Sequence, residues 1–137
     1  MLRNNMANIS NKKLFEKAKK LSKEKQLSEE STLGYVGSAL LSGEGKVYTG
    51  VSLSGACGLS FCGEVGTILS MLKNGETIIK KIVGVSNDYK YMPPCGRCRE
   101  LMFQIDRRNI NTEVILGENR VVKLKKLLPS RWQELWE

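Results

Sequence analysis

The sequence predicts an α/β fold with three layers, α/β/α, built on a mixed five-stranded sheet. In the second half of the chain, β-rich apolar runs alternate with helical patterns, which is typical of strands joined by helical crossovers. The first half instead holds two β-rich runs around a glycine turn, which indicates a hairpin. Because 137 residues without a repeat or a Pro/Gly linker suit one core, we expect a single domain over 1–137, with 1–10 flexible.

The first half of the chain is expected to begin with an amphipathic N-terminal helix over 11–26. Lysines cover one face of this helix, Ser10 or Asn11 caps it, and the apolar stripe comprises Leu14, Phe15, Ala18 and Leu21. A buried strand follows at 34–41, then a turn at 43–45 and a second strand at 46–50. The glycine-rich segment 52–60 is predicted to be a loop.

The second half is expected to alternate helices and strands. A helix from Cys62 to Lys73 ends at Asn74-Gly75, and its apolar face comprises Val65, Ile68, Leu69 and Leu72. A central strand is predicted at 78–85, and a rigid turn at Met92-Pro93-Pro94 precedes a helix over 95–105. The inward side chains of that helix are Leu101, Met102 and Ile105, and two further strands follow at 112–116 and 121–124.

Composition excludes several classes of protein. The chain has no histidine, so neither a Ser-His-Asp nor a Cys-His nucleophile system can be built, and any zinc must be held by thiolates or carboxylates. No apolar run approaches the about 18 residues of a membrane span, and the polar N-terminus lacks the core of a secretion signal. We therefore expect a cytoplasmic protein with no membrane partner, in which thiols stay reduced.

The net charge of +8 leaves two interpretations of the lysine clusters in the N-terminal helix and near the C-terminus. A basic chain can contact nucleic acid. The plainer interpretation is a solvated helix face, since the lysines lack the interleaved aromatic residues of a single-strand binder. A nucleic-acid partner is therefore not expected.

Three cysteines and one glutamate carry the strongest chemical signal. They lie in Cys62-Gly63-Glu64 and, further along the chain, in Pro94-Cys95-Gly96-Arg97-Cys98. Catalytic zinc keeps three protein ligands and one water, and Cys62, Cys95 and Cys98 form such a ligand set for one Zn²⁺ per chain. Both motifs fall at predicted helix N-termini, where partial positive charge stabilises thiolates. Arg97 and Arg99 are placed to add hydrogen bonds or positive charge around them.

Glu64 is placed to handle the protons of the zinc-bound water. Zinc brings the pKa of that water to about 7, and the resulting hydroxide attacks the ring carbon that bears an amino group. Glu64 takes the proton, gives it to the ring nitrogen, and then protonates the departing ammonia. This is the hydrolytic deamination of a cytosine-type ring.

Other interpretations of the same residues stay open. A Cys-x-x-Cys pair alone is equally typical of a redox pair or a structural zinc site. A structural site needs a fourth ligand, which Cys57 could supply, although a small buried loop residue is the simpler role for it. Glu64 alone would be an ordinary solvated helix residue, and its significance comes from its spacing to Cys62.

The two cysteine motifs resemble those of the zinc-dependent cytidine deaminase superfamily. The three-cysteine form is similar to the free-nucleoside branch, which includes cytidine deaminase and blasticidin S deaminase. The likeness extends to 36–41, 48–51 and 127–130, and it covers most of residues 12–130. It implies the cytidine deaminase-like fold, with Cys62, Cys95 and Cys98 as zinc ligands and Glu64 as the proton shuttle.

The resemblance also implies substrate contacts and an assembly. The backbone of Gly63 would help to bind the pyrimidine ring. Ser38 and the Leu-Leu-Pro-Ser ending look more like the blasticidin S type. Trp132 would cover a neighbouring active site, unless it and Trp136 serve core or interface packing. Members are commonly homo-oligomers, with a tetramer favoured over a dimer.

Several positions depart from the family pattern. Cytidine deaminases usually hold the ribose hydroxyls with an Asn-x-Glu, where this chain has Ser52-Leu53-Ser54. A strand phenylalanine that usually faces the pyrimidine is Gly34, an arginine that often follows the catalytic glutamate is Val65, and a usual glutamine is Glu100. Ordinary ribose recognition is therefore in question, and Ser52 and Ser54 become candidate substrate-binding residues.

The sequence thus favours a zinc hydrolase of the deaminase type that acts on cyclic amidines. Its substrate would be a free cytosine nucleoside, cytidine or deoxycytidine, or a related compound such as blasticidin S. Two alternatives are a deaminase that acts on a base within nucleic acid, whose relatives generally use histidine as first ligand, and a non-catalytic zinc-binding structural module.

Overall fold

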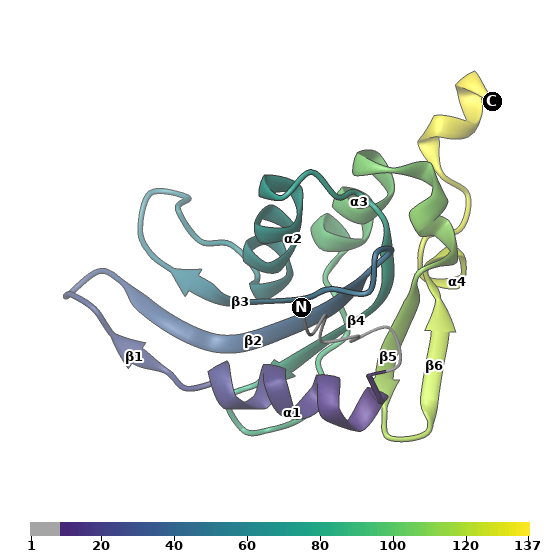
Figure 1. The fold of residues 1–137 in the computed structure, drawn as a ribbon. Coiled ribbons are helices and arrows are strands. Elements are labelled where there is room, and N and C mark those ends of the chain that lie inside the picture. Colours follow the sequence, from purple (N-terminus) through teal and green to yellow (C-terminus); the bar gives the residue numbers. More distant parts are fainter. Residues whose placement is uncertain (1–8) are drawn as a thin grey trace.

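A long antiparallel hairpin forms one side of the sheet in the computed structural model, which describes residues 9–137 (Figure 1). Strands β2 (Thr32–Ser42) and β3 (Val47–Ser54) are joined by the turn predicted at 43–45. β3 runs further than expected, because Leu53 and Ser54 pair with Leu33 and Thr32 of β2. The start of the segment predicted to be a loop, residues 52–54, is therefore strand.

The remaining strands extend the sheet from β2. Strand β4 (Ile79–Ser86) pairs antiparallel with β2, and β5 (Glu113–Gly117) pairs parallel with β4. The parallel pair is connected through helix α3 (Gly96–Ile105) and the 3₁₀ helix η2 (Arg107–Asn111), which is the helical crossover that the sequence predicts. Strand β6 (Arg120–Lys123) pairs antiparallel with β5. The predicted central strand, β4, lies between β2 and β5.

Within residues 9–137 the sheet has six strands rather than the predicted five, because the N-terminal helix is shorter than predicted. Helix α1 (Asn11–Leu21) ends at Ser22, whose hydroxyl donates a hydrogen bond to the Lys19 carbonyl. The last two residues of the range predicted as helix form strand β1 (Lys25–Gln26), which pairs with the start of β2. At its other end α1 is capped by Ser10, whose side chain accepts a hydrogen bond from the Lys13 N–H.

The helices cover the two faces of the sheet, so the predicted three layers are confirmed (Figure 1). One cluster of buried side chains packs with α1 and includes Leu14, Ala39, Val83 and Ile115. The opposite cluster packs with α2 (Gly63–Lys73), α3 and α4 (Leu124–Leu127), and its members include Leu40, Ile68, Ile82, Met102 and Val114. Neighbours along each strand belong to opposite clusters, as the alternation of side chains in a strand requires.

Helix α2 buries a different face from the one its apolar residues predict. Its buried residues are Gly63, Glu64, Thr67, Ile68 and Met71, whereas Leu69 is 55% exposed. The predicted stripe is wrong at Leu69, because two polar side chains, Glu64 and Thr67, occupy the buried face and conceal its period. Asn74 and Gly75 end this helix as predicted, and Gly75 has a positive φ of 82°.

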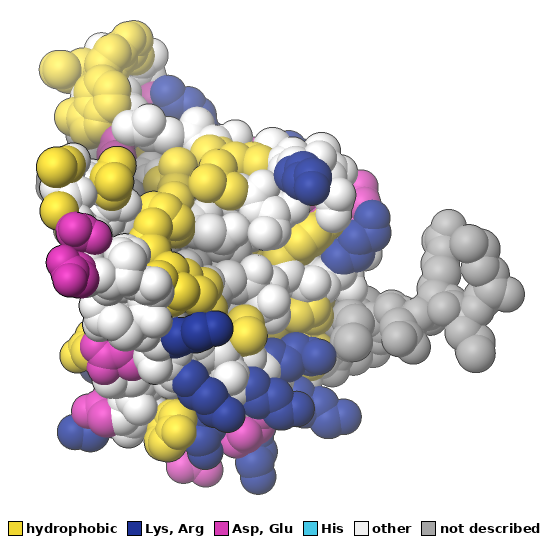
Figure 2. Space-filling model, turned by 90° about the vertical axis from the view of Figure 1, so that its left-hand side faces the viewer, with side chains coloured by type: hydrophobic (Ala, Val, Ile, Leu, Met, Phe, Trp, Pro, Cys, Tyr) yellow, Lys and Arg dark blue, Asp and Glu magenta, His cyan; other side chains and the backbone are white. Residues whose placement is uncertain are grey.

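The surface of the described part has two further features. Lys and Arg side chains gather low on the face in Figure 2, at the level of α1 in Figure 1, as a solvated basic helix face would place them. At the C-terminus, the 3₁₀ helix η3 (Trp132–Trp136) projects beyond the sheet. Among residues 9–137, no helix is long and apolar enough to cross a membrane. Residues 1–8 lie outside the described part, and with them most of the segment predicted to be flexible, whereas Ile9 is buried.

Candidate active site

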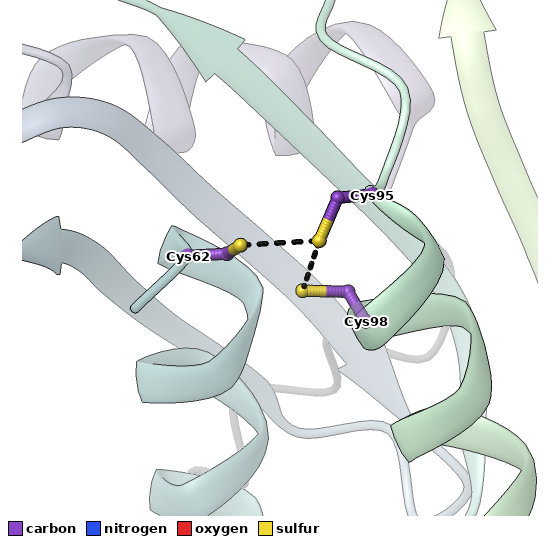
Figure 3. A group of neighbouring side chains, drawn as sticks. All are labelled: Cys62, Cys95 and Cys98. Atoms are coloured by element: carbon purple, nitrogen blue, oxygen red, sulfur yellow. Dashed lines mark hydrogen bonds between the residues drawn. The ribbon is translucent and has the colours of Figure 1, made fainter. Parts of the chain in front are cut away.

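Three cysteine sulfur atoms meet between the N-terminal ends of α2 and α3 (Figure 3). Cys62 is the N-cap residue of α2, Cys95 is the N-cap residue of α3, and Cys98 lies in the first turn of α3. The Sγ atom of Cys95 is 3.2 Å from Sγ of Cys62 and 3.6 Å from Sγ of Cys98. The structure therefore brings together the three residues predicted as metal ligands.

The spacing and chemistry of the three sulfur atoms fit a tetrahedral zinc ion. Zinc–sulfur bonds of about 2.3 Å at tetrahedral angles hold sulfur atoms about 3.8 Å apart. The observed separations of 3.2 and 3.6 Å are shorter, so a small outward shift of the side chains would admit the ion. Burial raises the pKa of the Cys98 thiol, and burial together with Cys95 raises that of Cys62. Burial also acts on Cys95, but hydrogen bonds from Cys98 and Arg97 lower its pKa. A divalent cation among the sulfur atoms would favour the thiolate form of all three.

Cys57 lies apart from this group. It is exposed in the loop between β3 and α2 and has a positive φ of 58°. The expectation of a small buried residue is therefore wrong, because the loop turns this side chain toward solvent. The compact sulfur group comprises only Cys62, Cys95 and Cys98 among the described residues, so Cys57 does not supply a fourth ligand. All four cysteines are free thiols.

The carboxyl group of Glu64 is buried beside the sulfur atoms. Glu64 lies in the first turn of α2 and is only 4% exposed, and its Oε2 atom is 3.9 Å from Sγ of Cys98. Burial raises the pKa of this carboxyl group. A carboxyl group with a raised pKa can both accept and donate a proton near neutral pH, which suits general acid–base catalysis.

A cavity of about 260 Å³ opens over Glu64 and two of the cysteines. Strands β2 and β3, the loop before α2 and the loop before α3 form its walls. Its lining residues are Tyr35, Val36, Ser52, Leu53, Ser54, Ser60, Phe61, Cys62, Glu64, Met92, Pro93, Cys95 and Arg97. The cavity therefore contains the predicted residues Ser52 and Ser54 together with the predicted catalytic carboxyl group.

The other predicted substrate-binding residues lie outside the lining of this cavity. Ser38 is fully buried, and its Oγ atom has no hydrogen-bond partner within residues 9–137. Gly63 packs closely against the same strand. A Cβ atom at Gly63 would lie 3.0 Å from the Val36 carbonyl oxygen and 3.5 Å from Cβ of Ser38. Trp132 is 54% exposed and donates a hydrogen bond from Nε1 to Glu100 Oε1. Within one chain, Trp132 does not reach the cavity.

The structure adds residues that the sequence did not single out. Tyr35, Phe61 and Met92 line the cavity, and their positions depend on pairing between distant strands and loops.

The two arginines beside the cysteines hold the loops of the site in place. Arg97 donates a hydrogen bond to the Ser60 carbonyl, and Arg99 donates to the carbonyls of Pro94 and Leu127.

Comparisons with known proteins agree with this geometry. The chain is 30% identical over 100 residues to a cytidine deaminase of Halalkalibacterium halodurans, covering 69% of this chain and 74% of that relative. The chain belongs to the cytidine deaminase family. It is also 37% identical over 104 residues to a probable cytidine deaminase of Dictyostelium discoideum, covering 72% of this chain and 69% of that relative. No protein-family profile matches the chain.

Solved structures of the cytidine deaminase family share the fold. The cytidine deaminase of Burkholderia pseudomallei superposes with a TM-score of 0.72 at 28% identity, covering 90% of this chain and all (100%) of that one. A mutant cytidine deaminase of Mycobacterium tuberculosis superposes with a TM-score of 0.76 at 22% identity, covering 91% and 99%. The predicted cytidine deaminase-like fold is therefore confirmed.

Proposed function

We propose that this protein is a zinc-dependent hydrolase that deaminates a free cytosine nucleoside, cytidine or deoxycytidine, or a related compound such as blasticidin S. The observation that carries the proposal is the buried Glu64 carboxyl group beside three clustered cysteine sulfur atoms at one cavity. Membership of the cytidine deaminase family supports it, since the curated relatives are named cytidine deaminase and probable cytidine deaminase.

In this proposal Cys62, Cys95 and Cys98 hold one zinc ion per chain. The fit of the sulfur separations and the positive ends of α2 and α3 support that assignment. When bound, the ion lowers the pKa of a water molecule in its fourth position to about 7.

Glu64 carries the proton steps. One Glu64 carboxylate oxygen accepts a proton from the attacking water, whose oxygen becomes the new carbonyl oxygen of the ring. The resulting carboxyl group donates that proton to the ring nitrogen beside the reacting carbon. It then accepts the second proton from the new hydroxyl group and donates it to the amino group, which leaves as ammonia while the carbon–oxygen double bond forms. The raised pKa of Glu64 supports this role, because a carboxylate with a raised pKa accepts a proton from water more readily than an ordinary one.

Substrate contacts come from the residues around the cavity. Ser52 and Ser54 replace the polar pair that holds ribose in other cytidine deaminases, and both line the cavity. We assign the Gly63 backbone to the pyrimidine ring, and Ser38 to a supporting contact beneath it, since the Ser38 hydroxyl has no hydrogen-bond partner among the described residues. Trp132 would contribute from a neighbouring subunit.

The assembly proposed is a homo-oligomer, a tetramer rather than a dimer, of single-domain cytoplasmic chains. The exposed hydrophobic side chains of η3 support self-association, because Trp132, Leu135 and Trp136 are all exposed in the single chain. Light scattering coupled to gel filtration measures the assembly directly. A monomer at micromolar concentration would contradict it.

The test of function is a deamination screen with the reduced, zinc-loaded protein. Cytidine, deoxycytidine, 5-methylcytidine and blasticidin S are followed by ultraviolet absorbance and by ammonia release. We expect turnover of at least one, and loss of turnover with retained zinc in Glu64→Gln. A wild-type protein that takes up no zinc, or a Glu64→Gln variant as active as wild type, would overturn the proposal.

A further inference from the structure

We propose that Tyr35, presented by a bulge in β2, forms the cavity wall against the N1 substituent of the substrate and so determines which cytosine compounds are accepted. This inference rests on the proposed function and adds a specificity-determining residue to it. Tyr35 lines the cavity and is 46% exposed, which is unusual for an aromatic side chain in a long central strand.

The strand pairing explains why Tyr35 faces the cavity. In the β2–β3 pair, Leu33 is opposite Leu53 and Gly37 is opposite Val51. Three residues of β2, 34–36, therefore face the single residue Ser52 of β3. A bulge of this kind turns side chains away from the regular alternation, and bulges are common beside active sites.

The bulge is fixed at both ends. Gly34 has a positive φ of 85°, and a Cβ atom there would collide with the Lys23 carbonyl oxygen just beyond α1. Glycine is therefore needed at this position. On the other side of Tyr35, the Val36 N–H donates a 2.9 Å hydrogen bond to the Ser52 hydroxyl, which is buried. Ser52 thus acts as a positioning residue for Tyr35 as well as a part of the cavity wall.

The depth of the cavity indicates which part of the substrate meets Tyr35. Glu64 is buried, so the amino group that reacts must enter first. In a cytosine ring, N1 lies across the ring from the carbon that bears the amino group. The N1 substituent therefore points toward the mouth, where Tyr35, Ser54, Pro93 and Arg97 are accessible.

The polar groups at the mouth define the class of substituent. Among the described lining residues, Glu64 is the only carboxylate, and the Ser60 hydroxyl is already bonded to the backbone of Gly55. The mouth thus lacks the carboxylate and amide that would hold a ribose diol. A site without a carboxylate and an amide for the ribose diol gains little from the 2′-hydroxyl and discriminates weakly for or against it. We therefore expect recognition through packing on the Tyr35 ring, with deoxycytidine and cytidine bound alike.

Calorimetric binding to zinc-loaded Glu64→Gln protein tests this inference without turnover. Cytidine and deoxycytidine are the ligands, and Tyr35→Ala is added to the Glu64→Gln background. We expect Kd to rise about tenfold for both ligands, because the apolar surface of the ring that packs on the N1 substituent is lost. Tyr35→Phe should retain most of the affinity, which separates the ring from its hydroxyl.

Matched variants control for unspecific effects. Tyr89→Ala removes another half-exposed tyrosine that does not line the cavity, and it should leave Kd unchanged. Ser52→Ala frees the Val36 N–H and should raise Kd in the same direction as Tyr35→Ala. Zinc content and thermal unfolding of each variant show whether the fold is kept.

The outcomes separate this inference from the proposed function. If Glu64→Gln binds a cytosine nucleoside and Tyr35→Ala binds it equally well, Tyr35 is not the wall and the proposed function stands. A preference of more than about a hundredfold for cytidine over deoxycytidine would also overturn the inference. If the protein neither binds nor deaminates any cytosine compound, the proposed function fails, and the inference fails with it.

Discussion

The carboxyl group of Glu64 lies over Gly84, in the space that a side chain at Gly84 would occupy. A Cβ atom built on Gly84 would be 2.5 Å from Glu64 Oε1 and 3.0 Å from the Met92 carbonyl oxygen. Gly84 pairs with Ser38 across β4 and β2, so these two strands together form the floor beneath the carboxyl group.

Gly84→Ala should therefore displace the Glu64 carboxyl group and lower kcat about tenfold, since small misplacements of a reacting group are costly. Zinc content should not change, because the atoms nearest to a Cβ at Gly84 belong to Glu64 and Met92 and not to a cysteine. Deamination kinetics measure the effect. Gly117→Ala is the matched control, since a Cβ atom there would meet only an ordinary contact with Arg120. Equal kcat values for the two variants would show that Glu64 does not need this space.

Zinc binding should depend on three cysteines and not on the fourth. Cys98→Ser removes a buried thiol from the sulfur group, and we expect the bound zinc to fall well below one ion per chain. Cys57→Ser should keep one ion per chain, because Cys57 is exposed and outside the group. Elemental analysis of the purified, reduced proteins measures this. Loss of zinc in Cys57→Ser would contradict the three-ligand site.

The side chain of Glu100 should hold the C-terminal segment on α3. Glu100 Oε1 accepts hydrogen bonds from Trp132 Nε1 at 2.6 Å, Gln133 Nε2 at 2.5 Å and Gln104 Nε2 at 2.9 Å. Glu100→Ala removes all three, so we expect a shift in tryptophan fluorescence and faster proteolysis near the C-terminus. Glu118→Ala, at an exposed turn, is the control. Identical proteolysis of both variants would show that Glu100 does not anchor the segment.

Asp106 should give the protein a pH-dependent part of its stability. Its carboxylate accepts hydrogen bonds from the backbone and side chain of Arg108 and from the Thr77 hydroxyl. The Arg108 side chain, followed by Thr77, holds the pKa of Asp106 below its ordinary value of 3.8. A carboxylate with a lowered pKa stabilises the fold above its unfolded pKa, and this stabilisation is lost as pH falls through its folded pKa.

Asp106→Asn should accordingly lower the free energy of unfolding at pH 7 by less than about 1 kcal/mol, because Asn keeps the N-cap hydrogen bond and loses only the charge that faces the largely exposed Arg108 side chain. The gap between wild type and variant should shrink as pH falls below about 4. Urea denaturation at pH 7 and pH 3 measures it. The difference between the two proteins is the relevant quantity, because acid would release bound zinc from the cysteines of both. A gap that widens in acid would contradict the assignment.

The sequence predicted the elements that depend on local signals. The helices that start after Cys62 and Cys95 were expected because each motif precedes a periodic apolar run, and their N-terminal position already pointed to clustered thiolates. The position of Leu69 is predicted wrongly because the buried face of α2 carries the polar side chains of Glu64 and Thr67, so it lacks a regular apolar pattern.

Features that depend on contacts between distant segments were not predictable. The helix predicted over 11–26 ends early because residues 25–26 pair with Thr32 and Leu33 of β2. The local sequence pattern does not indicate that pairing. Tyr35 reaches the cavity only because Ser52 and the end of α1 hold a bulge between them. The sequence shows a glycine at position 34, where the family usually has a phenylalanine. It does not show that the ring of Tyr35 lines the cavity.

Cys62 precedes strand β4 in the sequence, whereas Cys95 and Cys98 follow it. The three thiols lie together only where the N-terminal ends of α2 and α3 meet, and β4 separates these two helices in the sequence. Acquisition of the ion therefore reports that the two halves have met correctly. A truncated or misassembled chain would remain unmetallated and so could not release ammonia from any substrate.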